Sequence, residues 1–384
     1  MAVSVTGHDY LLSLKEQKDR RADYYETLYM DLLERKARAS GVPLNGQYEL
    51  TPLCNFDCGM CYTHLTREQM LGKPLLDVAQ WKHLTDQAFK AGLMRVNLTG
   101  GECLTYPGFE ELYLYLHSLG IEIRVLTNGA LLDNRWIRFF EAHPPIMIQI
   151  SLYGGDEETY ERVTGQRMFS VVSSNIRSLI DADLPVTLAV TPSRFMGLSG
   201  ALGTVHAAHD FGIPFGIVSH LSDPKAATGR SGQQLELTLD DYVEILRYRN
   251  RLDGIVNDET GPDQLPVPGG PHHTGGRCGL NCGGGLSSFN INWDGTMTIC
   301  TDSHDVVTEP LKEGFDACWN KIHRIAAGWH RPPECMDCPY EDICQNCELL
   351  KAAIAGGAGK QPLALCERTR YLVQHGVYTL PVCK

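Results

Sequence analysis

The sequence lacks several features that would each indicate a class of protein. No segment approaches the roughly 20 consecutive apolar residues that a membrane helix needs, so we expect no membrane span. The first residues show neither the basic nor the apolar segment of a signal peptide, which favours a cytoplasmic protein. Lys and Arg number 34 against 46 Asp and Glu, and the formal charge of −12 argues against nucleic-acid binding through a basic face. No internal repeat or low-complexity tract is found.

Cysteine is missing from a long central stretch, residues 104–277, and is concentrated on both sides of it. Of the 14 cysteines, four lie in residues 54–103 and ten in residues 278–383. The chain has 384 residues, of which 43% are hydrophobic, so it carries enough apolar material to fold without disulfides. Clustered thiols in a chain of this kind predict metal ligands rather than disulfide bonds.

The residue patterns divide the chain into four predicted parts. Residues 1–47 are charged, with apolar residues at helical spacing, and predict an N-terminal helical arm that packs on the main domain or docks a partner. Residues 48–225 alternate strand and helix patterns, residues 226–277 form a connecting region rich in Gly, Pro, Asp and Ser, and residues 278–384 hold most of the cysteines. This last part has little apolar core of its own, so we expect metal to stabilise it.

The alternating region predicts an α/β fold with a parallel sheet. Strands separated by helices of about 10–15 residues indicate βα units, whose functional groups gather at the carboxyl ends of the strands. The predicted strands are 47–51, 94–98, 121–126, 146–152, 186–190 and 215–218, and the predicted helices are 74–91, 109–119, 131–142, 171–182 and 239–252.

Three cysteines follow the first predicted strand at the spacing C-x3-C-x2-C, namely Cys54, Cys58 and Cys61. Three thiolates on one short loop can bind three irons of a [4Fe-4S] cluster and leave the fourth iron open to another ligand. A structural zinc ion prefers four protein ligands, and His64 is the candidate fourth ligand in that alternative.

This loop resembles the signature of the radical S-adenosylmethionine (radical SAM) superfamily, and the resemblance covers about residues 48–220. Thr99-Gly100-Gly101-Glu102 is similar to the Gly-Gly-Glu motif of that family, in which the carboxylate faces the ammonium group of S-adenosylmethionine. The resemblance implies a partial (β/α)6 TIM-like barrel. Two positions depart from the family pattern, since Met60 replaces a usual aromatic residue and Cys103 a frequent proline. The implied cofactor-binding residues are Met60, Tyr62, Thr99, Gly100, Gly101, Glu102, Asn128, Ser151 and Leu188.

The C-terminal cysteines form a second group. The run Cys335-x2-Cys338-x5-Cys344-x2-Cys347 is dense enough to predict a metal site from spacing alone. With the G-x4-C motif that ends at Cys300, the group resembles the SPASM extension of radical SAM enzymes, although the last spacing is x2 and not x3.

The SPASM resemblance implies two auxiliary [4Fe-4S] clusters, which brings the total to three. The implied ligands are Cys278, Cys282, Cys300 and Cys347 for one cluster, and Cys335, Cys338, Cys344 and Cys366 for the other. Cys103, Cys318 and Cys383 stay unassigned, with Cys318 as a possible substitute ligand. One or two zinc sites, or a single auxiliary cluster with spare thiols, are the alternatives.

The resemblance also implies the reaction. An electron donor such as flavodoxin or ferredoxin reduces the first cluster, S-adenosylmethionine is cleaved, and a 5′-deoxyadenosyl radical abstracts a substrate hydrogen. Auxiliary clusters favour oxidative modification or cross-linking of a ribosomally made peptide. The alternatives are a dehydrogenase or epimerase of a small molecule such as an aminocyclitol or sugar, and a zinc-stabilised binding module.

Two residues close after Cys300 are candidate bases for the proton that such an oxidation releases, Asp302 and His304. Sulfatase-maturating relatives carry an aspartate directly after the equivalent cysteine, where this chain has Thr301. A shift of one residue on an extended segment reverses the face of the side chain, which argues against formylglycine synthesis.

Overall fold

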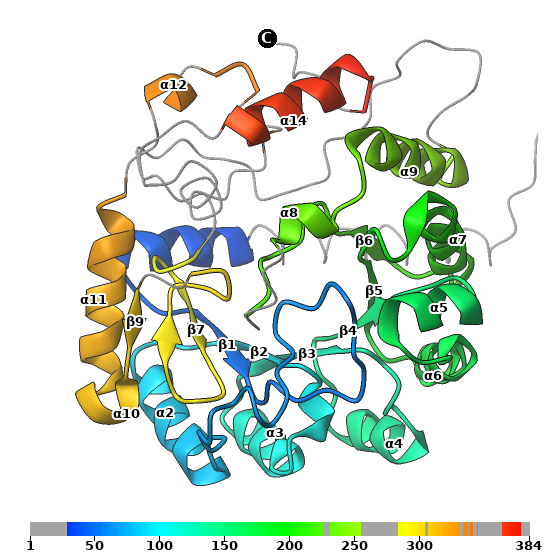
Figure 1. Ribbon diagram of the computed structural model, residues 1–384. Coiled ribbons are helices and arrows are strands. Elements are labelled where there is room, and N and C mark those ends of the chain that lie inside the picture. Colours follow the sequence, from blue (N-terminus) through cyan, green and yellow to red (C-terminus); the bar gives the residue numbers. More distant parts are fainter. Residues whose placement is uncertain are drawn as a thin grey trace, which may run out of the picture.

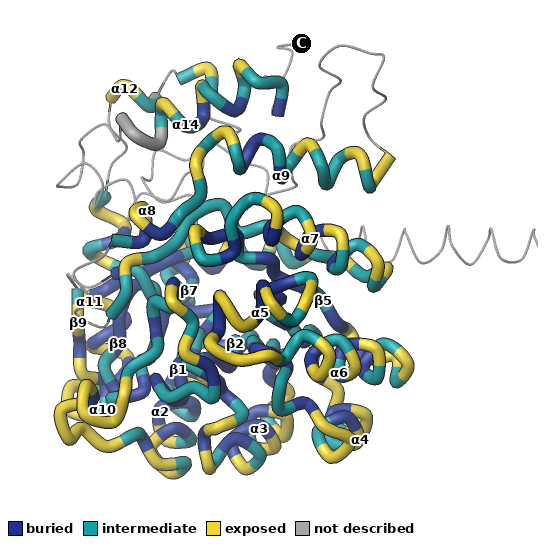
Figure 2. Tube along the Cα trace, turned by 45° about the vertical axis from the view of Figure 1, so that its right-hand side comes forward, coloured by how far each residue is buried: buried dark blue, intermediate teal, exposed yellow. Residues whose placement is uncertain are grey.

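The computed structural model describes residues 29–225, 231–254, 283–303, 306–329, 333–336, 338–340, 344 and 363–377. In this part, the strands form a curved sheet, and helices α2 to α7 lie along its outer side (Figure 1). Buried residues concentrate on the strands and on the inner sides of these helices, and exposed residues on the outer sides (Figure 2). The predicted partial barrel with a cysteine-rich C-terminal part is thereby confirmed.

One sheet of nine strands runs through the described structure in the order β6-β5-β4-β3-β2-β1-β7-β8-β9. Neighbours from β1 to β6 pair in parallel, as βα units require. The strands are β1 (Asn45–Glu49), β2 (Arg95–Thr99), β3 (Glu122–Thr127), β4 (Met147–Leu152), β5 (Val186–Val190), β6 (Phe215–Ile217), β7 (Ser288–Ile291), β8 (Met297–Thr298) and β9 (Val307–Thr308).

Alternation along each strand separates the core from the barrel interior. In β3, for example, Ile123 and Val125 are buried, whereas Glu122, Arg124 and Leu126 are only partly buried. Successive side chains of a strand point to opposite faces, so one set packs against the outer helices and the other faces inward. The inward-facing side chains at the carboxyl ends of the strands are therefore available to line a binding site.

Helices connect the strands and cover the sheet. Residues 29–40 are helical, and the other helices of eight or more residues follow in chain order. They are α2 (Val78–Lys90), α3 (Phe109–Ser118), α4 (Asn134–Ala142), α5 (Glu157–Thr164), α6 (Phe169–Asp181), α7 (Gly197–Asp210), α9 (Leu239–Leu252), α11 (Phe315–Ala327) and α14 (Leu363–Gln374). Shorter helical turns are η1 (Cys103–Thr105), α8 (Gly232–Leu235), α10 (Pro310–Glu313) and α12 (Pro333–Met336).

The start of α2 differs from the prediction, which placed it at Pro74. Asp77 accepts a hydrogen bond from the backbone N–H of Gln80, and the Gln80 side chain caps Asp77 in return. This capping box starts the helix at Val78. Asp77 itself is extended, and Leu76 before it donates its backbone N–H to the carbonyl of Trp293.

The cysteine-rich part of the chain shares its sheet with the barrel. Strand β7 pairs in parallel with β1, with Tyr48 opposite Ile291, and β8 and β9 extend the sheet in antiparallel fashion. Helix α11 covers this extension, where Phe315 packs edge-to-face on Phe289 at 5.0 Å between ring centroids. Residues far apart in sequence thus build one continuous core.

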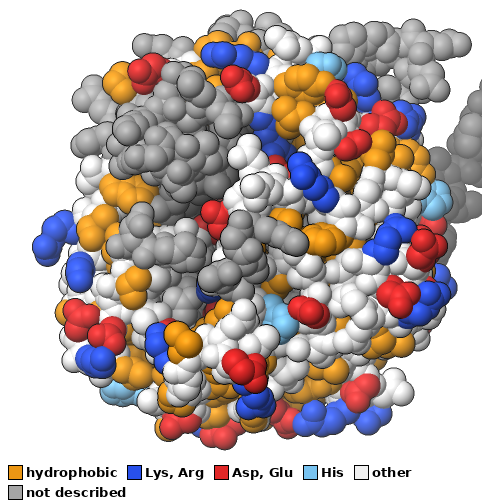
Figure 3. Space-filling model, viewed as in Figure 1, with side chains coloured by type: hydrophobic (Ala, Val, Ile, Leu, Met, Phe, Trp, Pro, Cys, Tyr) orange, Lys and Arg blue, Asp and Glu red, His pale blue; other side chains and the backbone are white. Residues whose placement is uncertain are grey.

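Helix α14 lies over α9 at the other end of the described structure (Figure 1). The Arg368 guanidinium stacks on the Tyr242 ring at 4.8 Å and pairs with Glu236. Within the described residues, no helix combines the length and the apolar character that crossing a bilayer requires. On the face drawn in Figure 3, charged side chains of both signs alternate around the periphery.

Candidate active site

A cavity of about 360 Å³ opens at the carboxyl ends of the barrel strands. The cysteine loop, the ends of β2 to β5 and two residues after Cys300 line it together. Its lining residues include Cys54, Phe56, Cys58, Met60, Cys61, Tyr62, Thr99, Gly100, Gly101, Asn128, Gln149, Ser151, Tyr153, Ala189, Thr191, His220, Thr301 and Asp302.

The cysteine loop directs hydrogen-bond donors at its own sulfur atoms. The backbone N–H groups of Phe56 and His64 lie 3.4 and 3.2 Å from the sulfurs of Cys54 and Cys61. The side-chain amide of Asn128 lies 3.6 Å from the Cys54 sulfur. Such donors stabilise negative charge on sulfur, so the loop is suited to thiolate ligands.

The three thiols share one partly buried environment. Burial raises the pKa of Cys54 to about 12, and burial together with the neighbouring thiols raises the pKa of Cys58. Burial also raises the pKa of Cys61. Three such thiols hold their protons in the absence of metal, so metal binding must release protons and supply the compensating charge.

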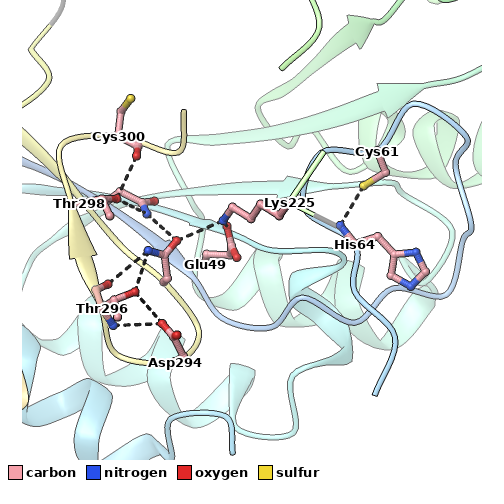
Figure 4. Close-up of polar contacts among 10 residues, drawn as sticks. Glu49, Cys61, His64, Lys225, Asp294, Thr296, Thr298 and Cys300 are labelled. Atoms are coloured by element: carbon pink, nitrogen blue, oxygen red, sulfur yellow. Dashed lines mark hydrogen bonds and ion pairs between the residues drawn. The ribbon is translucent and has the colours of Figure 1, made fainter. Parts of the chain in front are cut away.

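The geometry of His64 disfavours the zinc alternative. Its ring nitrogen Nδ1 lies 3.5 Å from the carboxylate of Asp57, and Figure 4 shows the ring turned away from the Cys61 sulfur. Within the described ranges, no three His, Cys, Asp or Glu side chains lie close enough to hold one metal ion. Each thiolate of a [4Fe-4S] cluster binds a separate iron, so the three thiols need not converge on one point.

Two glycines let β2 approach the cysteine loop closely. The N–H of Gly101 donates to the Thr51 carbonyl at 2.7 Å, and the N–H of Glu102 donates to the Leu53 carbonyl at 2.9 Å. A Cβ atom on Gly100 or Gly101 would lie 2.4 Å from a backbone oxygen of this segment, and Gly100 has φ +153°. Only glycine fits this contact, which holds the Gly-Gly-Glu motif against the chain that leads into Cys54.

The carboxylate of Glu102 faces the end of β3. It is 1% exposed and accepts hydrogen bonds from the Thr127 hydroxyl at 2.8 Å and from the backbone N–H of Leu104 at 3.1 Å. Burial raises the pKa of this carboxyl above its ordinary value. Thr99, Gly100 and Gly101 line the cavity beside it. The contact of Glu102 with the cofactor ammonium stays a prediction.

Most of the other predicted cofactor-binding residues line the cavity, namely Met60, Tyr62, Asn128 and Ser151. Leu188 is 1% exposed, and its backbone N–H donates to the Pro214 carbonyl. The neighbouring residues Ala189 and Thr191 line the cavity in its place.

Sequence reasoning missed several lining residues. Gln149 and Tyr153 flank Ser151 at a spacing of two along β4 and the residue after it, so they share its face. This period of two was the signal that would have identified them. Phe56 and His220 also line the cavity, but they lie on irregular segments, for which periodicity makes no prediction.

Of the two candidate bases, Asp302 lines the cavity together with Thr301. His304 lies outside the described residues, as do four of the cysteines: Cys278, Cys282, Cys347 and Cys383. Cys300, Cys335, Cys338, Cys344 and Cys366 are each partly buried.

Two unassigned cysteines are buried. The Cys103 thiol lies 3.3 Å from the Leu126 carbonyl, under the floor of the cavity. Cys318 is buried in α11. Both positions suit thiols that pack as small apolar groups.

A three-cysteine loop and a glycine motif at the carboxyl edge of a partial parallel barrel define a radical SAM enzyme. Residues 48–200 match the sequence model of the Radical SAM superfamily. These residues therefore form a Radical SAM domain, and that superfamily uses S-adenosylmethionine and a [4Fe-4S] cluster.

Two curated relatives come from Bacillus subtilis. The chain is 27% identical over 330 residues to the antilisterial bacteriocin subtilosin biosynthesis protein AlbA. The matched region covers 80% of this chain and 68% of AlbA. It is 28% identical over 169 residues to the sporulation killing factor maturation protein SkfB. This matched region covers 42% of this chain and 40% of SkfB.

The fold is similar to that of Streptococcus suis SuiB. For SuiB bound to S-adenosylmethionine, the TM-score is 0.61 at 14% identity, with 89% of this chain and 80% of that chain covered. For SuiB bound to the precursor peptide SuiA, the TM-score is 0.60 at 15% identity, with coverage of 89% and 81%. At such identities the similarity concerns the fold.

Proposed function

We propose that this radical SAM enzyme oxidatively modifies or cross-links a ribosomally made peptide. The observation that carries the proposal is the shared cavity, which the Cys54–Cys61 loop lines together with Thr301 and Asp302, directly after Cys300. The relatives support a peptide substrate, since AlbA and SkfB are named for the biosynthesis of subtilosin and the maturation of a killing factor, and SuiB has been solved with a precursor peptide.

The residues of the cavity suit this chemistry. A [4Fe-4S] cluster with S-adenosylmethionine, when bound, supplies a 5′-deoxyadenosyl radical that takes a hydrogen atom from the substrate. Cys54, Cys58 and Cys61 are the proposed ligands on this side. Met60 offers an apolar contact, and Ser151 offers a hydroxyl to the polar groups of S-adenosylmethionine.

Asp302 is the proposed base. Removal of two hydrogens from a substrate releases one hydrogen atom, one proton and one electron. A carboxylate on the substrate side of the cavity can accept the proton. Cys300 lies two residues before Asp302, so a cluster bound there would provide an acceptor for the electron. His304 is the second candidate base.

The auxiliary ligands are proposed as the resemblance to the SPASM extension implies them. One cluster would be held by Cys278, Cys282, Cys300 and Cys347. The other would be held by Cys335, Cys338, Cys344 and Cys366. The proposed domains are the arm 1–47, the barrel 48–225, the connection 226–277 and the cysteine-rich domain 278–384. A flavodoxin or ferredoxin is the proposed electron donor.

Iron counting and peptide mass spectrometry test this function. The anaerobically reconstituted protein should hold about twelve irons for three [4Fe-4S] clusters, whereas about eight would contradict two auxiliary clusters. Replacing Cys54, Cys58 and Cys61 together by Ala should abolish 5′-deoxyadenosine formation, and retained formation would refute their assignment. A ribosomally made peptide that serves as the substrate should lose two hydrogens per modification. An unchanged mass would contradict oxidation.

A further inference from the structure

Lys225 connects three segments that lie far apart in the sequence. Its backbone N–H donates to the carbonyl of Tyr62 at 2.8 Å, directly after Cys61 in the cysteine loop. Its ammonium nitrogen lies 2.6 Å from the carboxylate of Glu49, the last residue of β1. The same nitrogen lies 3.2 Å from the side-chain oxygen of Asn292, the residue that follows β7. Figure 4 shows the lysine side chain extended toward Glu49.

The ion pair is buried. The side chain of Lys225 is 16% exposed and that of Glu49 is 1% exposed. A carboxylate in such a place needs an opposite charge, because an unpaired buried charge is strongly unfavourable. The pair therefore holds the segment around residue 225 firmly against the end of β1.

A chain of hydrogen bonds continues from Asn292 to Cys300. The side-chain amide of Asn290 lies 3.0 Å from the Asn292 oxygen and 3.2 Å from the Thr298 hydroxyl. The Thr298 hydroxyl in turn donates to the Cys300 carbonyl at 2.9 Å (Figure 4). Polar contacts therefore run without a break from the cysteine loop, through Lys225, to the segment that carries Cys300.

We propose that Lys225 is a positioning residue that holds the β7–β8 hairpin, and with it Cys300 and Asp302, in one place relative to the Cys54–Cys61 loop. The inference rests on the proposed function, because it assumes that the substrate binds next to the β7–β8 hairpin. Residues of the cysteine loop and residues that follow the hairpin both line the cavity, so the distance between these two segments depends on the contacts of Lys225. Cleavage of S-adenosylmethionine depends on the Cys54–Cys61 loop. Modification of the substrate also needs the β7–β8 hairpin to be held at the correct distance from that loop.

A second lysine provides a matched control. Lys73 pairs with Asp294 at 2.8 Å, so it also ties the hairpin to the barrel part of the chain. The Lys73 side chain is 59% exposed, and Asp294, which is 14% exposed, also accepts hydrogen bonds from the backbone N–H and the hydroxyl of Thr296. Lys73→Met removes a lysine charge from the same hairpin, and Asp294 keeps its two hydrogen bonds from Thr296.

The test compares Lys73→Met with the double variant Lys225→Met/Glu49→Gln, which removes both buried charges and leaves no unpaired carboxylate. In the double variant, the ratio of modified peptide to 5′-deoxyadenosine should fall about tenfold to a hundredfold, because a misplacement of about 1 Å can lower a rate by this much. Its iron content and S-adenosylmethionine cleavage should match those of the parent. Lys73→Met should keep the parent ratio, and Lys225→Arg, which retains the cation, should recover part of it.

Hydrogen exchange measures the link without reference to the substrate. Backbone amides of residues 288–298 should exchange faster in the double variant than in Lys73→Met. An unchanged product ratio, unchanged exchange in the hairpin, or an equal fall in both variants would overturn the proposal. So would a joint loss of iron and cleavage, which would make Lys225 a general folding element. A parent protein that never modifies the peptide contradicts the proposed function, and the exchange experiment then still decides the role of Lys225.

Discussion

The backbone N–H of Asn128 donates a 2.7 Å hydrogen bond to the buried carboxylate of Glu102. The side-chain amide of Asn128 points onward, 2.7 Å from the Asn55 side-chain oxygen and 3.6 Å from the Cys54 sulfur. The Gly-Gly-Glu motif thereby reaches the cysteine loop through the end of β3. The cysteine loop, the Gly-Gly-Glu motif and the end of β3 are separated in the sequence but form one hydrogen-bonded unit.

Glu102→Gln should change the pH dependence of stability. Burial raises the pKa of Glu102 above the ordinary value of 4.5, so the folded state binds its proton more tightly than the unfolded chain does. The contribution of this group to stability is complete below 4.5 and is lost as the pH rises through the raised pKa. The unfolding free energy of the parent minus that of the variant should therefore fall as the pH rises above 4.5.

Urea denaturation at a series of pH values measures this difference. Glu111→Gln, which removes an exposed carboxylate that pairs with Lys82 on α2, is the control for the loss of a carboxylate outside the core. Parallel curves for the parent and Glu102→Gln would show that this carboxyl titrates alike in both states.

Gly101→Ala should displace the cysteine loop. Its Cβ would lie 2.4 Å from the Leu53 carbonyl oxygen and 2.7 Å from that of Pro52, both backbone atoms. Overpacking of this kind costs about 1–3 kcal/mol of unfolding free energy, and iron bound by the loop should be lost with it. The matched control is Gly203→Ala in α7, where a Cβ meets no atom within 4 Å. Equal stability and iron content in the two variants would contradict the close contact.

Asn128→Leu should lower the reduction potential of the cluster held by Cys54. The amide donor near the sulfur stabilises negative charge, which favours the reduced cluster. Loss of about one charge-assisted hydrogen bond corresponds to a shift on the order of tens of millivolts to more negative potential. A redox titration followed by electron paramagnetic resonance measures it. Asn175→Leu is the control, because that amide donates to the Gly129 carbonyl. A positive shift, or an equal shift in both variants, would refute this role.

Asp302→Asn should separate cofactor cleavage from product formation. The amide keeps the shape of the side chain on the cavity wall but cannot accept the substrate proton. Product formation should fall about 10²- to 10⁴-fold, the usual contribution of a general base, while 5′-deoxyadenosine still forms. Liquid chromatography with mass spectrometry measures both products in one reaction. Undiminished product would transfer the assignment to His304.

Local patterns predicted many elements closely. Strand β5 (Val186–Val190) and helix α9 (Leu239–Leu252) have the predicted bounds, because each is a clear periodic run. Helix α7 (Gly197–Asp210) was missed, since its three internal or terminal glycines and its many small residues give weak periodicity. Packing against β5 and α9 stabilises it, and such contacts leave little trace in the local sequence.

The amino-acid sequence by itself determined the chemistry of this protein. The spacing of Cys54, Cys58 and Cys61 and the Gly-Gly-Glu motif are local patterns, because these three cysteines lie on one short loop and the motif spans three consecutive residues. The tertiary structure alone decided that β7 pairs with β1 and that Lys225 pairs with Glu49. Both are contacts between residues more than 170 positions apart, |i−j| = 176 for the ion pair, and no local pattern specifies them. They arise because a buried strand edge needs a hydrogen-bonding neighbour and a buried carboxylate needs a cation.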